Sequence, residues 1–206
     1  KIFCIDKTDA DGSFTRSKSR MVANGATQSP SQYGDTHAAV PLPIHVRTTF
    51  AIAAALGITP YSLDVTAAYL HAPLEEELYL RLPNNCEQFL EGSQLEELNR
   101  LRGAARGGAS GARGTAREGA SGARGDDIVC WRLQKSIYGL KQAGANWMKL
   151  LSKALTDFGL SPCAKEPCLF RPVGDERRRR LGTLIVCVYV DDILVVAEKE
   201  SSREAL

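Results

Sequence analysis

Two apolar, β-branched runs, Leu184–Val190 and Ile193–Ala197, are separated by only two residues. This spacing is typical of a β-hairpin, with Asp191 and Asp192 as the link. Asp-Asp is a poor turn sequence, because tight turns favour Asn-Gly or Asp-Gly and because adjacent carboxylates repel each other. A local rule broken in this way marks a candidate functional site, with a divalent cation as the natural compensation. The alternative is two solvated aspartates in a surface turn.

A third carboxylate, Asp64, lies near the end of a short apolar segment, Tyr61–Val65, that reads as a strand. Aspartate is disfavoured in a strand unless it is paired or coordinated. Three carboxylates from two strands could hold two Mg²⁺ ions about 4 Å apart, the arrangement used in phosphoryl transfer. Spacing along the chain does not show that they meet.

The remaining pattern mixes helices and short strands without a βαβ rhythm, which predicts an α+β fold. The clearest helix is Ala143–Phe158, which has apolar residues on one face and Gly159 at its end. A second helix is predicted over His45–Leu56. Further short strands are predicted at Lys1–Ile5, Ser19–Ala23, Leu78–Leu82 and Ile128–Leu133.

Residues 99–125 contrast with the rest of the chain, since they hold six Arg, one Glu and eight of the 18 Gly. They contain no aromatic or β-branched apolar residue, so we expect a disordered insertion. A solvated linker is the favoured interpretation, and an Arg/Gly RNA-binding arm is the alternative.

Composition excludes some classes. No apolar run approaches the roughly 18 residues of a membrane helix, and the start of the chain lacks the shape of a signal peptide. The net charge is +2, and most of the positive excess lies in residues 99–125 and in the patch Asp175–Arg180, so the remainder is not a generally basic nucleic-acid binder. The six scattered cysteines favour reduced thiols of an intracellular protein, with zinc binding or disulfides as the alternative.

Four blocks, in order along the chain, resemble Ty1/copia-type retrotransposon reverse transcriptases. Ser17–Gly25 is similar to the family's KARLVARG block, and Leu63–Tyr79 resembles LDVxxAFLxGxLxEEIYM. Trp131–Ala143 resembles the block around KSLYGLKQAP, and Tyr189–Leu194 is identical to the YVDDIL signature. The resemblance implies a right-hand polymerase fingers–palm fragment with an antiparallel palm sheet and packed helices. It divides the chain into 1–98 (fingers and first part of the palm), the insertion 99–127, and 128–206 (the remainder through the YVDD hairpin).

The resemblance also implies roles for the carboxylates. Asp64, Asp191 and Asp192 become the catalytic, metal-binding residues, with Asp191 as a direct ligand and Asp192 as the supporting carboxylate. The cofactor is then Mg²⁺, as two ions, with Mn²⁺ as an alternative. One ion would lower the pKa of a primer 3′-OH, and the other would bridge the triphosphate.

Nucleotide-binding residues follow from the same blocks. Lys18 and Arg20 correspond to basic residues that hold the β- and γ-phosphates, and Ala67 and Ala68 would offer backbone N–H groups to the triphosphate. Tyr69 matches the steric gate against a ribose 2′-OH, and Gly139 would allow close approach to the template–incoming base pair. The alternatives are a core aromatic for Tyr69 and a surface charge for Lys18.

The function implied is that of an RNA-directed DNA polymerase domain of a retrotransposon, acting on an RNA template, a DNA primer and deoxynucleoside triphosphates. The implied partners are the rest of the Pol polyprotein (thumb, RNase H and integrase), with no membrane. The implied location is the cytoplasm, in a virus-like particle, with a nuclear stage as a further option. Leu206 lies 14 residues past Asp192, so we expect the thumb to be absent and the chain alone to be inactive. The alternatives are a degenerate, inactive retroelement fragment with at most weak RNA binding, and a two-metal nuclease.

Overall fold

A computed structural model of the chain describes residues 2–81, 90–107 and 130–206. The chain divides into two compact units, one of Lys1–Glu76 with Gln134–Leu206 and one of Glu77–Leu133. In chain order, the elements of the first unit are β1 (Ile2–Thr8), β2 (Phe14–Met21), η1 (Gly25–Thr27), η2 (Pro30–Gln32), α1 (Pro43–Ala55), β3 (Tyr61–Asp64), η3 (Ala68–His71), α3 (Ala143–Phe158), β6 (Leu160–Cys163), β7 (Glu166–Pro172), α4 (Asp175–Leu181), β8 (Leu184–Tyr189), β9 (Asp192–Ala197) and α5 (Glu200–Glu204). The second unit has β4 (Tyr79–Arg81), α2 (Ser93–Gly107) and β5 (Cys130–Arg132).

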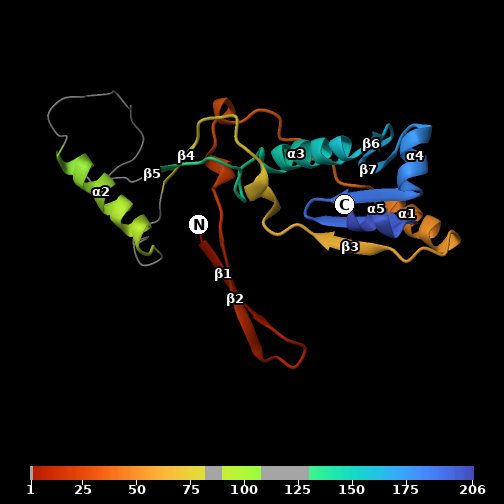
Figure 1. The fold of residues 1–206 in the computed structure, drawn as a ribbon. Helices are drawn as coiled ribbons and strands as arrows, with labels where there is room; N and C mark the ends of the chain where they lie inside the picture. Colours follow the sequence, from red (N-terminus) through yellow and green to blue (C-terminus); the bar gives the residue numbers. More distant parts are fainter. Residues whose placement is uncertain (1, 82–89, 108–129) are drawn as a thin grey trace. The chain divides into compact units, whose positions relative to one another are not determined.

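The first unit is built on a five-stranded antiparallel sheet in the order β3-β9-β8-β7-β6 (Figure 1). A separate antiparallel ribbon is formed by β1 and β2. The described residues therefore form a mixed α/β structure with antiparallel sheets, which agrees with the α+β class predicted from the sequence.

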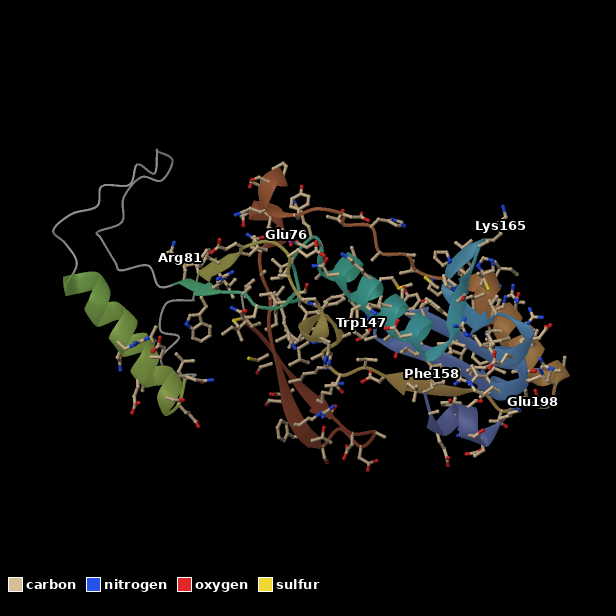
Figure 2. The ribbon with its side chains drawn as sticks, turned by 45° about the horizontal axis from the view of Figure 1, so that its top comes forward. Glu76, Arg81, Trp147, Phe158, Lys165 and Glu198 are labelled. Carbon is tan, nitrogen blue, oxygen red and sulfur yellow. The ribbon has the colours of Figure 1, made fainter. Side chains whose placement is uncertain are left out.

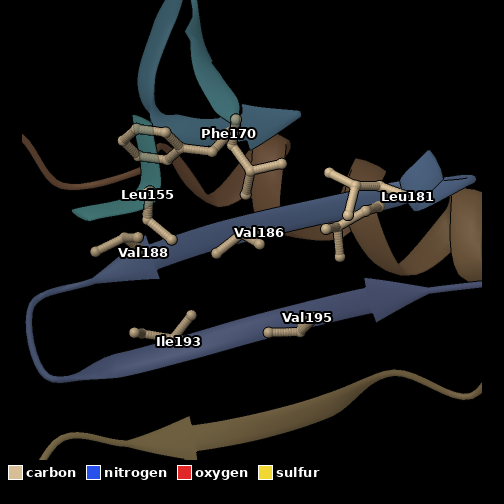
Figure 3. Close-up of a cluster of buried hydrophobic side chains, with 9 residues drawn as sticks. Leu155, Phe170, Leu181, Val186, Val188, Ile193 and Val195 are labelled. Carbon is tan, nitrogen blue, oxygen red and sulfur yellow. The ribbon is translucent and has the colours of Figure 1, made fainter. Parts of the chain in front are cut away.

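The hairpin β8–β9 lies in the interior of this sheet and carries its core. Val186 pairs with Val195 and Val188 with Ile193, and all four are buried. These side chains pack with residues from α3, α4 and the neighbouring strands (Figure 3). Cys187 and Val196, which alternate with them and point to the opposite face, are buried as well. The strands are thus covered on both faces, which explains why their sequence is continuously apolar.

Two helices confirm their sequence predictions closely. Helix α3 has the predicted bounds, and Gly159 ends it with φ +113°, a left-handed conformation that glycine adopts without strain. Helix α1 starts at Pro43, two residues before the predicted start, with the proline in its first turn, where no N–H is needed.

A buried carboxylate ties α1 to the sheet. Glu166 is 5% exposed, and its Oε2 accepts hydrogen bonds from the Leu42 N–H and the His45 ring. Its Oε1 accepts the N–H of Cys168. The start of the helix and the start of β7 are therefore held by one side chain.

The second unit corrects one prediction. Helix α2 runs to Gly107, so residues 99–107 of the predicted insertion are helical rather than disordered. Alanine and arginine are good helix formers, and Leu98 is buried against Leu90 and Trp131. The rest of the insertion, like parts of the predicted strands at 82 and 128–129, lies outside the described residues. The expected divisions at 98 and 128 also differ from the two compact units.

Candidate functional site

The two segments that carry the candidate carboxylates are neighbours in the five-stranded sheet, where β3 is an edge strand. Strand β3 pairs with β9, so that Asp64 lies opposite Asp192. One residue further, the Val65 N–H donates to the carbonyl oxygen of Asp191 at 2.9 Å. Residues 126 and 128 positions apart in sequence are therefore neighbours, as the carboxylate hypothesis requires.

The hairpin turn lies one residue earlier than the sequence predicted. Tyr189 pairs with Asp192, so the linking residues are Val190 and Asp191, and Asp192 belongs to β9. Val190 has φ +56°, an outlier for a β-branched residue that costs on the order of 1–3 kcal/mol. The indole N–H of Trp147 donates a hydrogen bond to the carbonyl oxygen of Val190 at 2.7 Å. Strain of this kind is typical of functional sites.

Asp64 and Asp191 line one cavity of about 430 Å³. Part of the lining comes from β2, where Arg16, Lys18 and Arg20 stand at alternate positions and so share one face of the ribbon. The cavity thus brings two carboxylates and three cations together. Its lining residues are Arg16, Ser17, Lys18, Ser19, Arg20, Met21, Asp64, Val65, Thr66, Ala67, Leu70, Ile137, Tyr138 and Asp191.

Aromatic contacts extend from the basic wall toward the carboxylates. The Arg20 guanidinium lies over the ring of Tyr138, 4.9 Å from its centroid. That ring lies 4.8 Å from the ring of Tyr69. Burial raises the pKa of the Tyr69 phenol above its ordinary value, and the negative charge of Asp191 raises it further. Tyr69 is therefore a neutral hydroxyl donor at physiological pH.

The predicted site residues fall into two groups. Asp64, Asp191, Lys18, Arg20 and Ala67 line the cavity. The others, Asp192, Ala68, Tyr69 and Gly139, are not among its lining residues. Ala68 is 1% exposed and packs against Ala72 and Trp147.

Gly139 has a structural reason of its own. With φ +90°, it sits against the backbone of Ala23, and an added Cβ would collide with the Ala23 carbonyl oxygen. Ala23 also donates its N–H to the Tyr138 carbonyl at 2.7 Å. The glycine allows this close approach between segments of the same chain.

The donor set of the cavity suits a hard divalent cation. Carboxylate oxygens are preferred ligands of Mg²⁺, which needs only one or two of them when substrate phosphates complete its shell. Asp64 and Asp191 supply two. Among residues 2–81, 90–107 and 130–206, no group of three or more His, Cys, Asp or Glu side chains is gathered as a metal site. Asp64, Asp191 and Asp192 therefore do not gather into such a group in this conformation.

Sequence reasoning missed Arg16, Thr66 and Tyr138 as cavity residues. The signal for Arg16 was present, because it precedes Lys18 by two positions in a segment that alternates basic and small residues. Tyr138 became visible only through its contacts with Arg20 and Tyr69.

Comparison with known proteins identifies the family. Residues 2–104 and 119–204 match the model of the family described as reverse transcriptase (RNA-dependent DNA polymerase). The chain belongs to this family. The Ty1/copia-type resemblance of the four sequence blocks is confirmed by the relatives of this reverse transcriptase chain.

Three relatives are Pol polyproteins of transposons. The chain is 27% identical over 193 residues to the retrovirus-related Pol polyprotein from transposon TNT 1-94 of Nicotiana tabacum, covering 93% of this chain and 12% of the relative. It is 28% identical to the corresponding polyprotein from transposon RE2 of Arabidopsis thaliana, covering 92% and 10%. It is 26% identical to the truncated transposon Ty1-A Gag-Pol polyprotein of Saccharomyces cerevisiae, covering 92% and 12%. This reverse transcriptase chain thus spans about a tenth of the length of these relatives.

No solved structure matches the chain. Within the part that the structure describes, no helix has both the length and the apolar character needed to cross a bilayer.

Proposed function

We propose that the cavity between β2 and the Asp64 and Asp191 segments is the nucleotidyl-transfer site of a reverse transcriptase, which adds a deoxynucleotide to a primer 3′-OH on an RNA template. The β1–β2 ribbon then belongs to the fingers and the five-stranded sheet to the palm. One observation carries the proposal: two carboxylates and three cations line the same cavity of about 430 Å³. A nucleoside triphosphate with its counter-ion needs this pairing of charges.

The basic wall binds the triphosphate in this proposal. Arg16, Lys18 and Arg20 present charged donors from one face of β2, and hydrogen bonds between ionised partners are about twice as strong as neutral ones. The ring of Tyr138 holds the Arg20 guanidinium in place. Ala67, whose backbone adopts φ +55° beside Asp64, offers its N–H group to the same phosphates.

The carboxylates hold the cation. Asp64 and Asp191 bind a divalent ion directly, and Asp192 supports them from the adjacent position in β9. When bound, the ion lowers the pKa of the attacking hydroxyl and neutralises charge on the phosphates. Tyr69, neutral and next to Asp191, is the candidate steric gate against a ribose 2′-OH.

The partners proposed are the RNA template, the DNA primer and deoxynucleoside triphosphates. The relatives are Pol or Gag-Pol polyproteins, so we infer that this domain works beside other Pol segments, including a thumb, RNase H and integrase. The alternative of an inactive remnant is not favoured, because the cavity keeps both carboxylates and the basic wall.

Binding of deoxythymidine triphosphate with Mg²⁺, measured by titration calorimetry, tests the proposal. We expect Asp191→Asn to weaken binding at least about tenfold, since it removes a charged ligand. The matched control is Asp175→Asn, an acidic residue in the first turn of α4, outside the cavity. Equal affinities of the wild type and Asp191→Asn, or binding that does not depend on Mg²⁺, would contradict the proposal.

A further inference from the structure

Val190 is the turn residue that places Asp191. Its φ of +56° is unusual for a β-branched side chain, so the turn needs support from its surroundings. The next residue, Asp191, lines the cavity and accepts the Val65 N–H on its carbonyl oxygen. A shift of Val190 would therefore move the carboxylate of Asp191 relative to that of Asp64.

The support comes from Trp147 of α3 (Figure 2). This side chain is 5% exposed, and its indole N–H donates to the Val190 carbonyl at 2.7 Å. This bond is partly buried, and its loss would leave a partly desolvated carbonyl without its donor, so it holds the Val190 carbonyl in place.

The same indole contacts the other carboxylate segment. Trp147 packs against buried Ala68 and Ala72, and partly buried Val65 and Tyr69 belong to the same cluster. Val65 directly follows Asp64, and Ala68 opens η3. One rigid ring therefore packs on the segment that follows Asp64 and donates a hydrogen bond to Val190, the residue that precedes Asp191.

We propose that Trp147 is a positioning residue, which sets the separation of Asp64 and Asp191 by holding Val190 in its left-handed conformation while packing on the segment that follows Asp64. The inference rests on the proposed function, because it concerns the two carboxylates that hold the cation there. It assigns a task to a residue that is not among those lining the cavity.

The test is binding of Mn²⁺ alone to the full chain, measured by electron paramagnetic resonance of the free ion. Trp147→Phe keeps an aromatic ring in the core and removes the indole N–H. We expect the Mn²⁺ dissociation constant to rise about tenfold. The chain has two tryptophans, and Trp131→Phe, in β5 of the second unit, is the matched control with an unchanged dissociation constant.

Two further readouts separate positioning from general stability. Hydrogen exchange of the Val65 amide, whose acceptor is the Asp191 carbonyl, should speed up about tenfold in Trp147→Phe, while Val195 in the sheet core keeps its rate. Glycine adopts a positive φ readily. Val190→Gly should therefore restore part of the Mn²⁺ affinity in the Trp147→Phe background, and it also gives a second variant if the single substitution folds poorly.

The outcomes distinguish the two proposals. Failure of the wild-type chain to bind Mn²⁺ would overturn the proposed function, and the inference with it. Mn²⁺ binding that is the same in the wild type and Trp147→Phe, with unchanged exchange at Val65, would overturn the inference alone. An affinity loss that Val190→Gly does not relieve at all would also overturn it, because the indole would then not act through the conformation of Val190.

Discussion

At the residue scale, the Asp-Asp pair of the hairpin pointed to the candidate site, but the geometry of the turn differs from the prediction. The sequence placed both aspartates in the turn, whereas Tyr189 pairs with Asp192 and the turn is Val190-Asp191. This shift of one position separates the two carboxylates: Asp191 faces the cavity and Asp192 continues the strand. No propensity predicts a valine with positive φ, because the conformation is held by tertiary contacts of Trp147.

A first prediction concerns Arg16, the cavity cation that the sequence did not single out. Arg16→Gln should weaken deoxynucleoside triphosphate binding about tenfold, because it removes one charged donor from the basic wall. The control is Lys7→Gln, since Lys7 pairs with Arg16 on β1 but does not line the cavity. Titration calorimetry measures both. Equal losses in the two variants would indicate general electrostatics rather than a specific contact.

A second prediction concerns Gly139. Gly139 has a φ of +90°, and the Cβ of Gly139→Ala would also collide with the Ala23 carbonyl oxygen. Gly12 has a similar φ of +83°, but the Cβ of Gly12→Ala would have no other atom within 4 Å. We expect Gly12→Ala to cost about 1 kcal/mol of unfolding free energy. Gly139→Ala should cost at least about 2 kcal/mol more. Urea denaturation measures the difference. Similar costs for both variants would show that the close backbone approach does not constrain the fold.

At the element scale, strongly periodic segments were predictable and irregular ones were not. Helix α3 and the hairpin β8–β9 follow their apolar patterns. Strands β6 and β7 were missed because Pro162, Pro172 and Glu166 interrupt any apolar pattern. Proline is tolerated in β6 because that strand lies at the sheet edge, and Glu166 because three hydrogen bonds satisfy it. Such compensation depends on partners distant in sequence.

The contacts of Glu166 give an acid-stability prediction. Burial raises the pKa of its carboxyl, but the N–H groups of Cys168 and Leu42 and the His45 ring favour the charged form and hold the pKa below its ordinary value of 4.5. The resulting stability is present above about pH 4.5 and is lost as the pH falls through the lower folded-state pKa.

Glu166→Gln should therefore lower the unfolding free energy by about 2 kcal/mol at pH 7. The difference from the wild type should shrink as the pH falls below about 4.5, because the wild-type carboxyl then becomes neutral too. Urea midpoints across pH 3 to 7 measure this effect, with Glu176→Gln in the first turn of α4 as the exposed control. A difference that stays constant with pH would show that the charge of Glu166 contributes nothing.

At the scale of the whole molecule, charge is distributed unevenly. The chain has a net charge of +2, but among the described residues the basic groups that line the cavity are Arg16, Lys18 and Arg20. The exposed cluster Arg177–Arg180 belongs to α4 and is not part of that lining. We therefore expect nucleic-acid and nucleotide phosphates to bind this small set of cations.

Salt dependence tests this assignment. Each phosphate contact changes the slope of log K against log salt by about −0.9 on duplex nucleic acid, so three contacts give a slope of about −3. We expect weak binding of a primer–template duplex with this slope, measured by fluorescence anisotropy. Replacing Arg177–Arg180 by Gln should leave the slope unchanged. A much steeper slope that those substitutions flatten would place the main phosphate contacts on α4.

The central claim is that Asp64 and Asp191 share a cation in the cavity beside β2. Paramagnetic broadening by Mn²⁺ of the backbone amide resonances of ¹⁵N-labelled chain tests it most directly, because broadening depends on distance from the ion. The account predicts selective broadening at residues 64–67 and 190–192, which Asp191→Asn abolishes. Broadening centred instead on the acidic residues Asp35, Glu75 and Glu76, which line a different cavity, or broadening that persists in Asp191→Asn, would contradict it.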